Sequence, residues 1–334
     1  MLILSLSCNV NIVKDCFLYG EIKMIVTVTM NPAIDKTVEL TSFIHGGLNR
    51  IKQVEYDAGG KGINVSKTIC ELGGKSIATG FLAGNSGETI LRVLKKRGIH
   101  CDFVTVPGET RTNTKVVEED GTLTELNEPG PIISEVHLTE LQNKLLTYAN
   151  EDTLFIFAGS IPTGVSKDIY GKLITLVKEK GATVILDADG EVFRNAVESG
   201  PDYIKPNHVE LEAYCGLPTD ANESELVKAA KTFALKGVKN VVISMGKSGA
   251  LFFLDGYKVK CPGLSVKTHS TVGAGDAMVA ALAYAWDKKL EKEEMVKLCM
   301  ATSAGAVTTI GTKPPSREVV DGLMEQVIIK KIGE

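Results

Sequence analysis

The 334-residue sequence contains 37 Lys and Arg and 41 Asp and Glu, a net charge of -4 at pH 7, and 44% of its residues are hydrophobic. This supply of apolar side chains is enough for one large α/β domain with an appendage or for two medium domains. The charges form no long single-sign run, so composition excludes the electrostatic footprint of a protein that binds nucleic acid or an anionic membrane. An anionic ligand would need a local site.

The ends of the chain and the cysteines bear on location. Seven scattered cysteines with no Cys-x-x-Cys pair favour buried thiols in a reducing cytoplasm. Residues 1–23 begin with a short apolar run, but no basic residue precedes it and it falls far short of the ~18 apolar residues of a membrane span. Because Met24 opens a strand pattern, we expect residues 1–23 to be an N-terminal extension outside a fold that occupies 24–334.

In chain order, short β-branched runs alternate with longer segments whose apolar residues recur every three or four positions. The runs predict strands at 25–29, 153–157, 183–186, 203–205 and 240–244, and the longer segments predict helices at 61–71, 86–96, 166–180 and 224–236. Apolar strands separated by helices are typical of a parallel sheet covered on both faces. The sequence therefore predicts an α/β fold with a mainly parallel central sheet.

Two stretches, 36–56 and 103–127, interrupt this alternation. Polar and β-branched residues alternate in both, and Glu119-Asp-Gly121 marks a hairpin turn. We expect extra antiparallel strands here, inserted in the α/β core. Such strands would form a small β-sheet lid at the carboxyl ends of the main sheet, where open α/β folds bind ligands.

The segment from Gly273 to Asp276 carries the sharpest chemical signal. Gly273 and Gly275 let backbone N–H groups converge at the start of a helix, a place that favours an anion, and Asp276 lies in the first turn of that helix. A carboxylate beside bound phosphoryl oxygens can accept the proton of an attacking hydroxyl. The alternative is an ordinary helix cap after a glycine turn.

A second glycine cluster runs from Asp57 to Ser66 and leads into a helix. Gly59 and Gly60 would let the backbone approach a polyhydroxylated ligand, Asn64 could donate to and accept from sugar hydroxyls, and Lys61 supplies a charge. A tight strand-to-helix turn explains the glycines equally well. Neither glycine cluster has the spacing of a P-loop or of a dinucleotide-binding motif.

Three smaller groups follow predicted strands or lie in the expected lid. Asp35 comes just after the first strand and is suited to two sugar hydroxyls, or it is a turn residue. Asn207 and Glu210 are one helical turn apart, a spacing that fits a metal-bound water near phosphates or a helix cap. Arg111 could clamp a substrate phosphate or lie on a solvated face.

Taken in this order, the segments resemble the PfkB family of carbohydrate kinases from Met24 to nearly the end of the chain. The family's two signatures correspond to Ala58-Gly-Gly-Lys-Gly-Ile-Asn-Val-Ser66 with Leu72-Gly-Gly74, and to Ser270-Thr-Val-Gly-Ala-Gly-Asp276. Asn31-Pro32, Thr110-Arg-Thr-Asn113 and Thr124 to Pro131 look most like members that phosphorylate fructose 1-phosphate, and next like those that use tagatose 6-phosphate.

The resemblance implies a ribokinase-like three-layer fold with a β-sheet lid, ATP and Mg²⁺ as cofactors, and a homodimer paired lid to lid. It assigns Asp276 as catalytic base and Gly273, Ala274 and Gly275 as an anion hole. It further implies three groups of binding residues: Asp35, Gly59, Gly60, Lys61, Asn64 and Arg111 for the phosphosugar; Lys205, Asn207, Ser244 and Gly246 for the nucleotide; and Glu210 with Asn207 for Mg²⁺, through water.

The sequence departs from the family pattern at Ala277, where many relatives have serine, and in the N-terminal extension. The expected reaction is phosphorylation of fructose 1-phosphate at its C6 hydroxyl, with tagatose 6-phosphate as the alternative substrate. A catalytically silent sensor of sugar phosphate or ATP is the alternative of another class. The intact Gly273 to Asp276 segment argues against a sensor, which needs no base beside an anion hole.

Overall fold

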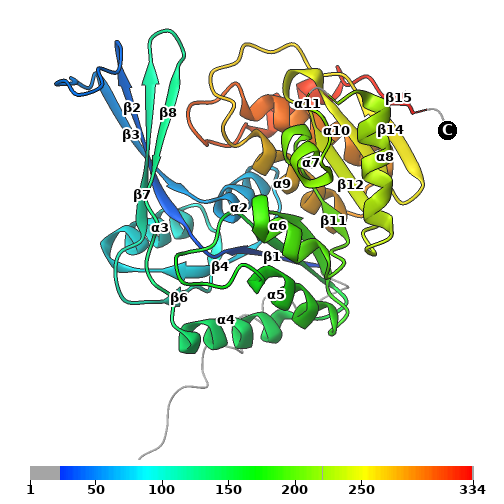
Figure 1. Cartoon of the computed structure of the whole chain (residues 1–334), viewed down its shortest axis with the longest axis horizontal. Helices are drawn as coiled ribbons and strands as arrows, with labels where there is room; N and C mark the ends of the chain where they lie inside the picture. Colours follow the sequence, from blue (N-terminus) through cyan, green and yellow to red (C-terminus); the bar gives the residue numbers. More distant parts are fainter. Residues whose placement is uncertain (1–22, 220, 333–334) are drawn as a thin grey trace, which may run out of the picture.

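A computed structural model describes residues 23–219 and 221–332 of the chain (Figure 1). The expected extension therefore lies outside the described residues, apart from Lys23. A large mixed sheet forms the centre of the molecule. Its strands stand in the order β15 (Lys330–Lys331), β14 (Tyr257–Cys261), β13 (Ala250–Leu254), β12 (Asn240–Ser244), β11 (Tyr203–Ile204), β10 (Thr183–Asp187), β9 (Thr153–Ala158), β1 (Met24–Thr29), β4 (Ile77–Leu82) and β5 (His100–Cys101), and β6 (Val104–Thr105) also pairs with β4.

Pairing is parallel from β5 to β12 and antiparallel from β12 to β15. This confirms the mainly parallel sheet that the alternating pattern predicts. The pairs β12–β13 and β13–β14 can be antiparallel because short connections without an α-helix join these strands.

Helices cover both faces of the sheet and make three layers. One face packs against α2 (Lys61–Glu71), α9 (Ala274–Asp287), α10 (Lys292–Ala306) and α11 (Arg317–Met324). The other packs against α4 (Glu135–Tyr148), α5 (Ile169–Lys178), α6 (Gly190–Val197), α7 (His208–Cys215) and α8 (Glu223–Ala234). Helix α3 (Gly84–Lys96) adds a smaller cluster, and a short 3₁₀ turn, η1 (Gly246–Ser248), follows β12.

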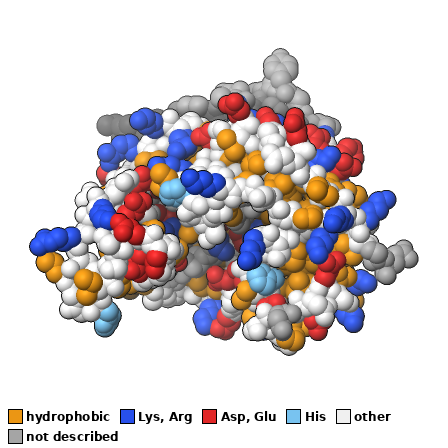
Figure 2. Space-filling model, turned by 90° about the horizontal axis from the view of Figure 1, so that it is seen from above, with side chains coloured by type: hydrophobic (Ala, Val, Ile, Leu, Met, Phe, Trp, Pro, Cys, Tyr) orange, Lys and Arg blue, Asp and Glu red, His pale blue; other side chains and the backbone are white. Residues whose placement is uncertain are grey.

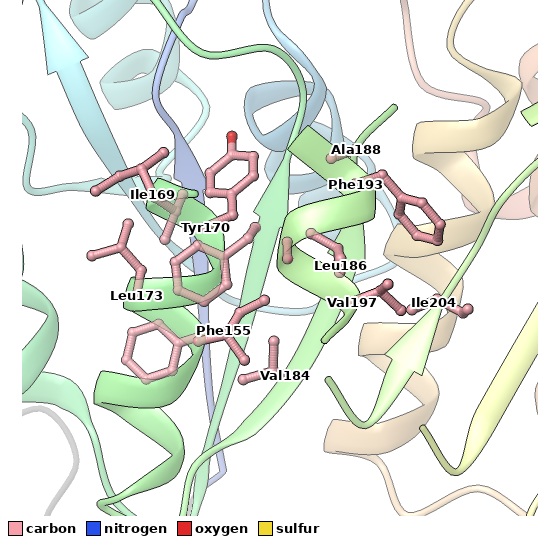
Figure 3. Close-up of a cluster of buried hydrophobic side chains, with 14 of the residues drawn as sticks. Phe155, Ile169, Tyr170, Leu173, Val184, Leu186, Ala188, Phe193, Val197 and Ile204 are labelled. Carbon is pink, nitrogen blue, oxygen red and sulfur yellow. The ribbon is translucent and has the colours of Figure 1, made fainter. Parts of the chain in front are cut away.

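Alternate residues of the central strands supply the two cores, as the twofold period of a strand requires. On β9, Leu154 and Ile156 belong to the core under α9, whereas Phe155 and Phe157 belong to the core under α5. Figure 3 shows Phe155 near Leu173 of α5 and Val184 of β10, within this second core. The continuous burial of β9 matches its apolar sequence.

A separate four-stranded sheet, which we call the lid sheet, stands away from the main body (Figure 1). Its order is β3 (Gln53–Gly59), β2 (Ala33–Leu40), β7 (Arg111–Glu118) and β8 (Leu123–Asn127). It comes from the two stretches that interrupt the α/β alternation. Two details differ from expectation: β6 pairs with the main sheet, and β2 pairs with β7 in parallel. The pairing is parallel because both strands leave the main sheet in the same direction.

The five cysteines among the described residues are free. None of the helices in the ranges 23–219 and 221–332 combines the length and the apolar character that crossing a bilayer demands. Charged side chains of both signs are interspersed on the face shown in Figure 2, as the composition indicates. The cytoplasmic location itself stays a prediction.

Candidate active site

The start of helix α9 supplies the anion-binding end of the site. Gly273 caps the helix with a φ of 86°, a left-handed conformation that favours glycine. A side chain at Gly275 would place its Cβ 3.1 Å from the Lys205 ammonium, so the glycine keeps that approach open. Gly273, Ala274 and Gly275 therefore present backbone N–H groups where a lysine also lies, a combination suited to phosphoryl oxygens.

Asp276 lies in the first turn of α9 and is 8% exposed. The amide nitrogen of Asn64 donates a 2.8 Å hydrogen bond to its Oδ2, across 212 residues of sequence. Burial, and next the negative charge of Asp187, raise the pKa of Asp276 to about 6, against the opposing effect of Lys61. A carboxylate with a pKa near neutrality is suited to accept a proton at physiological pH.

Asp187, at the carboxyl end of β10, is a site residue that the sequence analysis missed. Its side chain is 2% exposed, and the ammonium groups of Lys61 and Lys205 lie 3.5 Å from its Oδ1. Although burial opposes ionisation, these two cations hold the pKa of Asp187 below its ordinary value. Neither carboxylate oxygen has a hydrogen-bond partner among the described residues. Its position at the end of a predicted parallel strand was the available signal.

Asp35 and Gly59 are packed directly together on β2 and β3. A Cβ at Gly59 would lie 2.5 Å from the Asp35 Cγ, so glycine is required for the contact, and Gly60 follows with a φ of 108°. Lys115, on β7, places its ammonium 3.1 Å from Asp35 Oδ2, and both side chains are 8% exposed. The sequence analysis did not name Lys115 either. It lies four residues after Arg111 on the same strand, so the twofold period of a strand places both on one face.

Arg111, at the start of β7, connects three loops through hydrogen bonds. Its guanidinium donates to the carbonyl oxygens of Asn31 (3.0 Å) and Glu128 (3.1 Å) and to the hydroxyl of Ser160 (3.2 Å). Its Nε is buried and has no partner in the part of the chain that the structure describes. The structure thus shows Arg111 holding backbone, a role that neither sequence-based alternative included.

Lys205, Asn207 and Glu210 lie between β11 and α7, beside the end of β12. Asn207 and Glu210 form a reciprocal capping box, each side chain accepting from the other's backbone N–H at 2.8 Å. The capping interpretation of this motif is therefore confirmed. Asn207 also bridges to Ser244 at the end of β12, and Gly246 begins η1 with a φ of 54°. The proposed nucleotide residues thus meet at one edge of the sheet.

The donor set fits a magnesium ion held partly through water. Among the described residues, Asp187 offers two buried oxygens without hydrogen bonds. The negative charge of Asp187, and to a smaller extent those of Asp276 and Glu210, raise the pKa of Lys61, so these carboxylates lie near one another. Mg²⁺ prefers oxygen ligands and keeps several waters. Within the described ranges no group of three or more His, Cys, Asp or Glu side chains is arranged to hold a metal ion.

Comparison with known proteins gives the site a context. Residues 25–318 match the model of the pfkB family carbohydrate kinases. Proteins named 1-phosphofructokinase are similar over most of their length: 37% identity in Borreliella burgdorferi, covering 86% of this chain and 92% of the relative, and 34% in Bacillus subtilis, covering 92% and 100%.

Solved structures are also similar to this chain over most of its length. Phosphofructokinase-2 from Escherichia coli in complex with fructose-6-phosphate superposes with a TM-score of 0.85 at 27% identity, covering 91% of this chain and 99% of that one. A possible 1-phosphofructokinase from Thermotoga maritima gives 0.82 at 27% identity, covering 93% and 100%. The tetrameric inhibited form of the Escherichia coli enzyme gives 0.84 at 28% identity, covering 91% and 99%.

Proposed function

Because the chain belongs to the PfkB family of carbohydrate kinases, we propose that it transfers the γ-phosphoryl group of ATP to the C6 hydroxyl of fructose 1-phosphate. The products are fructose 1,6-bisphosphate and ADP. The observation that carries the proposal is buried Asp276, with a pKa raised to about 6, in the first turn of a helix whose leading N–H groups are suited to bind an anion. A binding protein would gain nothing from a costly buried base.

In the proposed reaction, Asp276 accepts the proton of the C6 hydroxyl while that oxygen forms a bond to the γ-phosphorus. The bond from the γ-phosphorus to the bridging oxygen breaks, and ADP leaves with the electron pair. Gly273, Ala274 and Gly275 donate backbone hydrogen bonds to the transferred group, and Lys205 adds positive charge beside them. Asn64 keeps the Asp276 carboxylate oriented through its 2.8 Å hydrogen bond.

The sugar is proposed to lie over the Gly59–Gly60 turn. Asp35 and Asn64 face its hydroxyls, and the amide oxygen of Asn64, which is buried without a partner among the described residues, is free to accept one of them. Lys61 and Arg111 lie toward its phosphate. Gly59 lets Asp35 pack against the backbone there, which fixes the carboxylate.

Asn207, Ser244 and Gly246 are proposed to contact the nucleotide, with Glu210 and Asp187 holding Mg²⁺ through water. The ion would supply positive charge that offsets the developing charge on the phosphates. Asp187 also holds Lys61 and Lys205, one from each half of the site. As a shared counter-ion, the Asp187 carboxylate would offset the repulsion between the two ammonium groups and hold them at a set spacing.

The test is ADP release from ATP and Mg²⁺ with fructose 1-phosphate, fructose 6-phosphate and tagatose 6-phosphate compared by kcat/KM. We expect the highest value for fructose 1-phosphate. A higher value for either 6-phosphate would overturn the substrate and leave the kinase standing. No ADP release with any sugar phosphate, together with tight binding of one, would favour the sensor instead.

A further inference from the structure

A buried ion pair behind the sugar-binding turn has no part in the reaction just described. The Lys67 ammonium is wholly buried and lies 2.7 Å from Asp57 Oδ2, whose side chain is 21% exposed. It also donates a 2.7 Å hydrogen bond to the carbonyl oxygen of Ala58. The hydroxyl of Thr312 donates to the same Asp57 oxygen at 3.2 Å. Asp57 Oδ2 thus accepts hydrogen bonds from a lysine on α2 and from a threonine in a loop that is distant in sequence.

These contacts connect parts of the site that the main chain does not. Ala58 directly precedes Gly59 and Gly60, so Lys67 fixes the backbone at the entry to the sugar-binding turn. Lys67 is also one turn beyond Asn64 on α2, and Asn64 binds Asp276. On the other side, a Cβ built at Gly273 would lie 3.6 Å from Thr312, so the loop bearing Thr312 packs against the cap of α9.

A second contact follows the same path. Lys313 places its ammonium 3.1 Å from Glu55, two residues before Asp57 on the same lid strand. This pair is partly exposed and is weak by itself. Together, the two contacts mean that consecutive residues of one loop, Thr312 and Lys313, both bind β3.

The buried position of Lys67 is not explained by a gain in stability, because moving a charged group out of water costs free energy. A buried ion pair is often replaceable by apolar side chains of similar volume with no loss of stability. Burial lowers the pKa of Lys67, and Asp57 opposes that shift, so the ammonium depends on its partner. Lys67 is a buried charge that also binds the backbone of Ala58, next to the Gly59–Gly60 turn. This combination points to a role beyond packing.

We propose that Lys67, Asp57 and Thr312 are positioning residues that hold the sugar-binding turn and the anion-binding start of α9 in one fixed relation, through the base of the lid sheet. The names of these two site parts rest on the proposed function; the contacts do not. The cluster touches no reacting atom and acts through Gly59, Gly60 and Gly273.

Kinetics of Lys67→Met, Thr312→Val and Thr312→Ser test the proposal. Lys67→Met should lower kcat more than tenfold and raise the KM for the phosphosugar more than fivefold, with the KM for ATP within twofold of wild type. Thr312→Val should lower kcat at least fivefold, and Thr312→Ser, which keeps the hydroxyl, should restore it. The double variant Asp57→Asn/Lys67→Met should recover stability relative to Lys67→Met but not kcat.

The matched control is the ion pair of Lys178 and Asp202, 2.9 Å apart and partly buried at the opposite, amino-terminal edge of the sheet. The double variant Lys178→Met/Asp202→Asn should change the melting temperature and leave kcat and both KM values within twofold. If the Lys67 and Thr312 variants behave like this control, the cluster is structural only and the proposal is wrong.

Amide hydrogen exchange gives a readout that needs no substrate. In Lys67→Met, exchange at residues 58–61 and 271–275 should speed up at least tenfold, while the control pair leaves both segments unchanged. Unchanged exchange there overturns the proposal even if the chain turns over some other sugar. Conversely, a wild-type chain that uses no phosphosugar removes the proposed function, and the exchange result still decides this inference.

Discussion

Burial makes ionisation of Asp276 unfavourable, and the same raised pKa suits the carboxylate to the proposed role of general base. Asp276→Asn keeps the shape of the side chain and can still accept from Asn64, but it cannot take a proton at this pH. We expect kcat to fall by ~10²-fold to ~10⁴-fold with little change in the KM for ATP, the usual size of a general-base contribution. Steady-state kinetics at pH 7.5 check this. Retention of a third or more of kcat would remove Asp276 from the role.

The same residue predicts an effect on stability. The pKa of Asp276 is about 6 in the folded state against 3.8 ordinarily, so between these values the folded state binds more protons than the unfolded state. Stability therefore falls as pH rises through this window, and above pH 6 the ionised carboxylate costs up to about 3 kcal/mol. Asp276→Asn should raise the free energy of unfolding at pH 7 to 8. Urea titrations should show the gain disappearing below pH 4.

Glu210 combines a structural and a proposed electrostatic role, and glutamine separates them. Gln can still accept from the Asn207 backbone in the capping box but carries no charge. Glu210→Gln should therefore raise the Mg²⁺ concentration needed for half-maximal activity at least threefold with almost no change in melting temperature. Glu225→Gln, in the equivalent capping box of α8, is the control. An unchanged Mg²⁺ titration would exclude Glu210 from the metal site.

At the scale of elements, the lid sheet contributes Asp35 on β2 and Lys115 on β7, which pair with each other next to Gly59. Closure of such a sheet over sugar and nucleotide would exclude water from the phosphoryl group. Exchange of backbone amides in 33–59 and 111–127 should slow when a sugar phosphate and a non-hydrolysable ATP analogue bind together. Strands β13 and β14, at the far edge, should not respond. Equal exchange with and without ligands would contradict closure.

Local pattern was enough to predict the parallel strands β1, β9, β10, β11 and β12, the helices α2, α3, α5 and α8, and the glycine turn that precedes α2. It did not predict strand β4 or helices α4 and α6. What it could not supply was partnership between distant segments. Lys67 looks like a solvated position on an amphipathic helix, and it is buried because Asp57 approaches from another strand. Asp187 looks like any polar residue after a strand until two lysines from other segments converge on it.

The lid sheet also shows the difference between pattern and pairing. Alternation predicted its strands, but the register and the parallel pairing of β2 with β7 depend on how both leave the main sheet. For Arg111 the sequence offered a phosphate clamp or a solvated face, and it gave no sign of the hydrogen bonds that the guanidinium donates to the carbonyl oxygens of two loops. Contacts of this kind are fixed by the assembled fold and leave no periodic trace in the sequence.

At the scale of the whole molecule, the outer face of the lid sheet carries an unburied apolar surface. Val54 and Tyr56 on β3 and Leu126 on β8 are 39%, 65% and 55% exposed. We propose that a second copy of the chain covers this face, lid sheet to lid sheet. Tyr56→Lys/Leu126→Lys should shift the sedimenting species from dimer to monomer. A control with Leu235→Lys, exposed on the far side after α8, should not, and a wild-type monomer would refute the pairing.

The order of strands in the main sheet has a consequence for synthesis. Strand β1 lies between β4 and β9. All three strands precede residue 159 in the sequence, so they can pair before the ribosome has added α9. The Gly59–Gly60 turn can therefore form before Asp276 has been made. The hydrogen bond from Asn64 to Asp276 spans 212 residues and can form only once α9 has left the ribosome. If Asp276 is the base, as proposed, a nascent chain consequently stays inactive until α9 has been added.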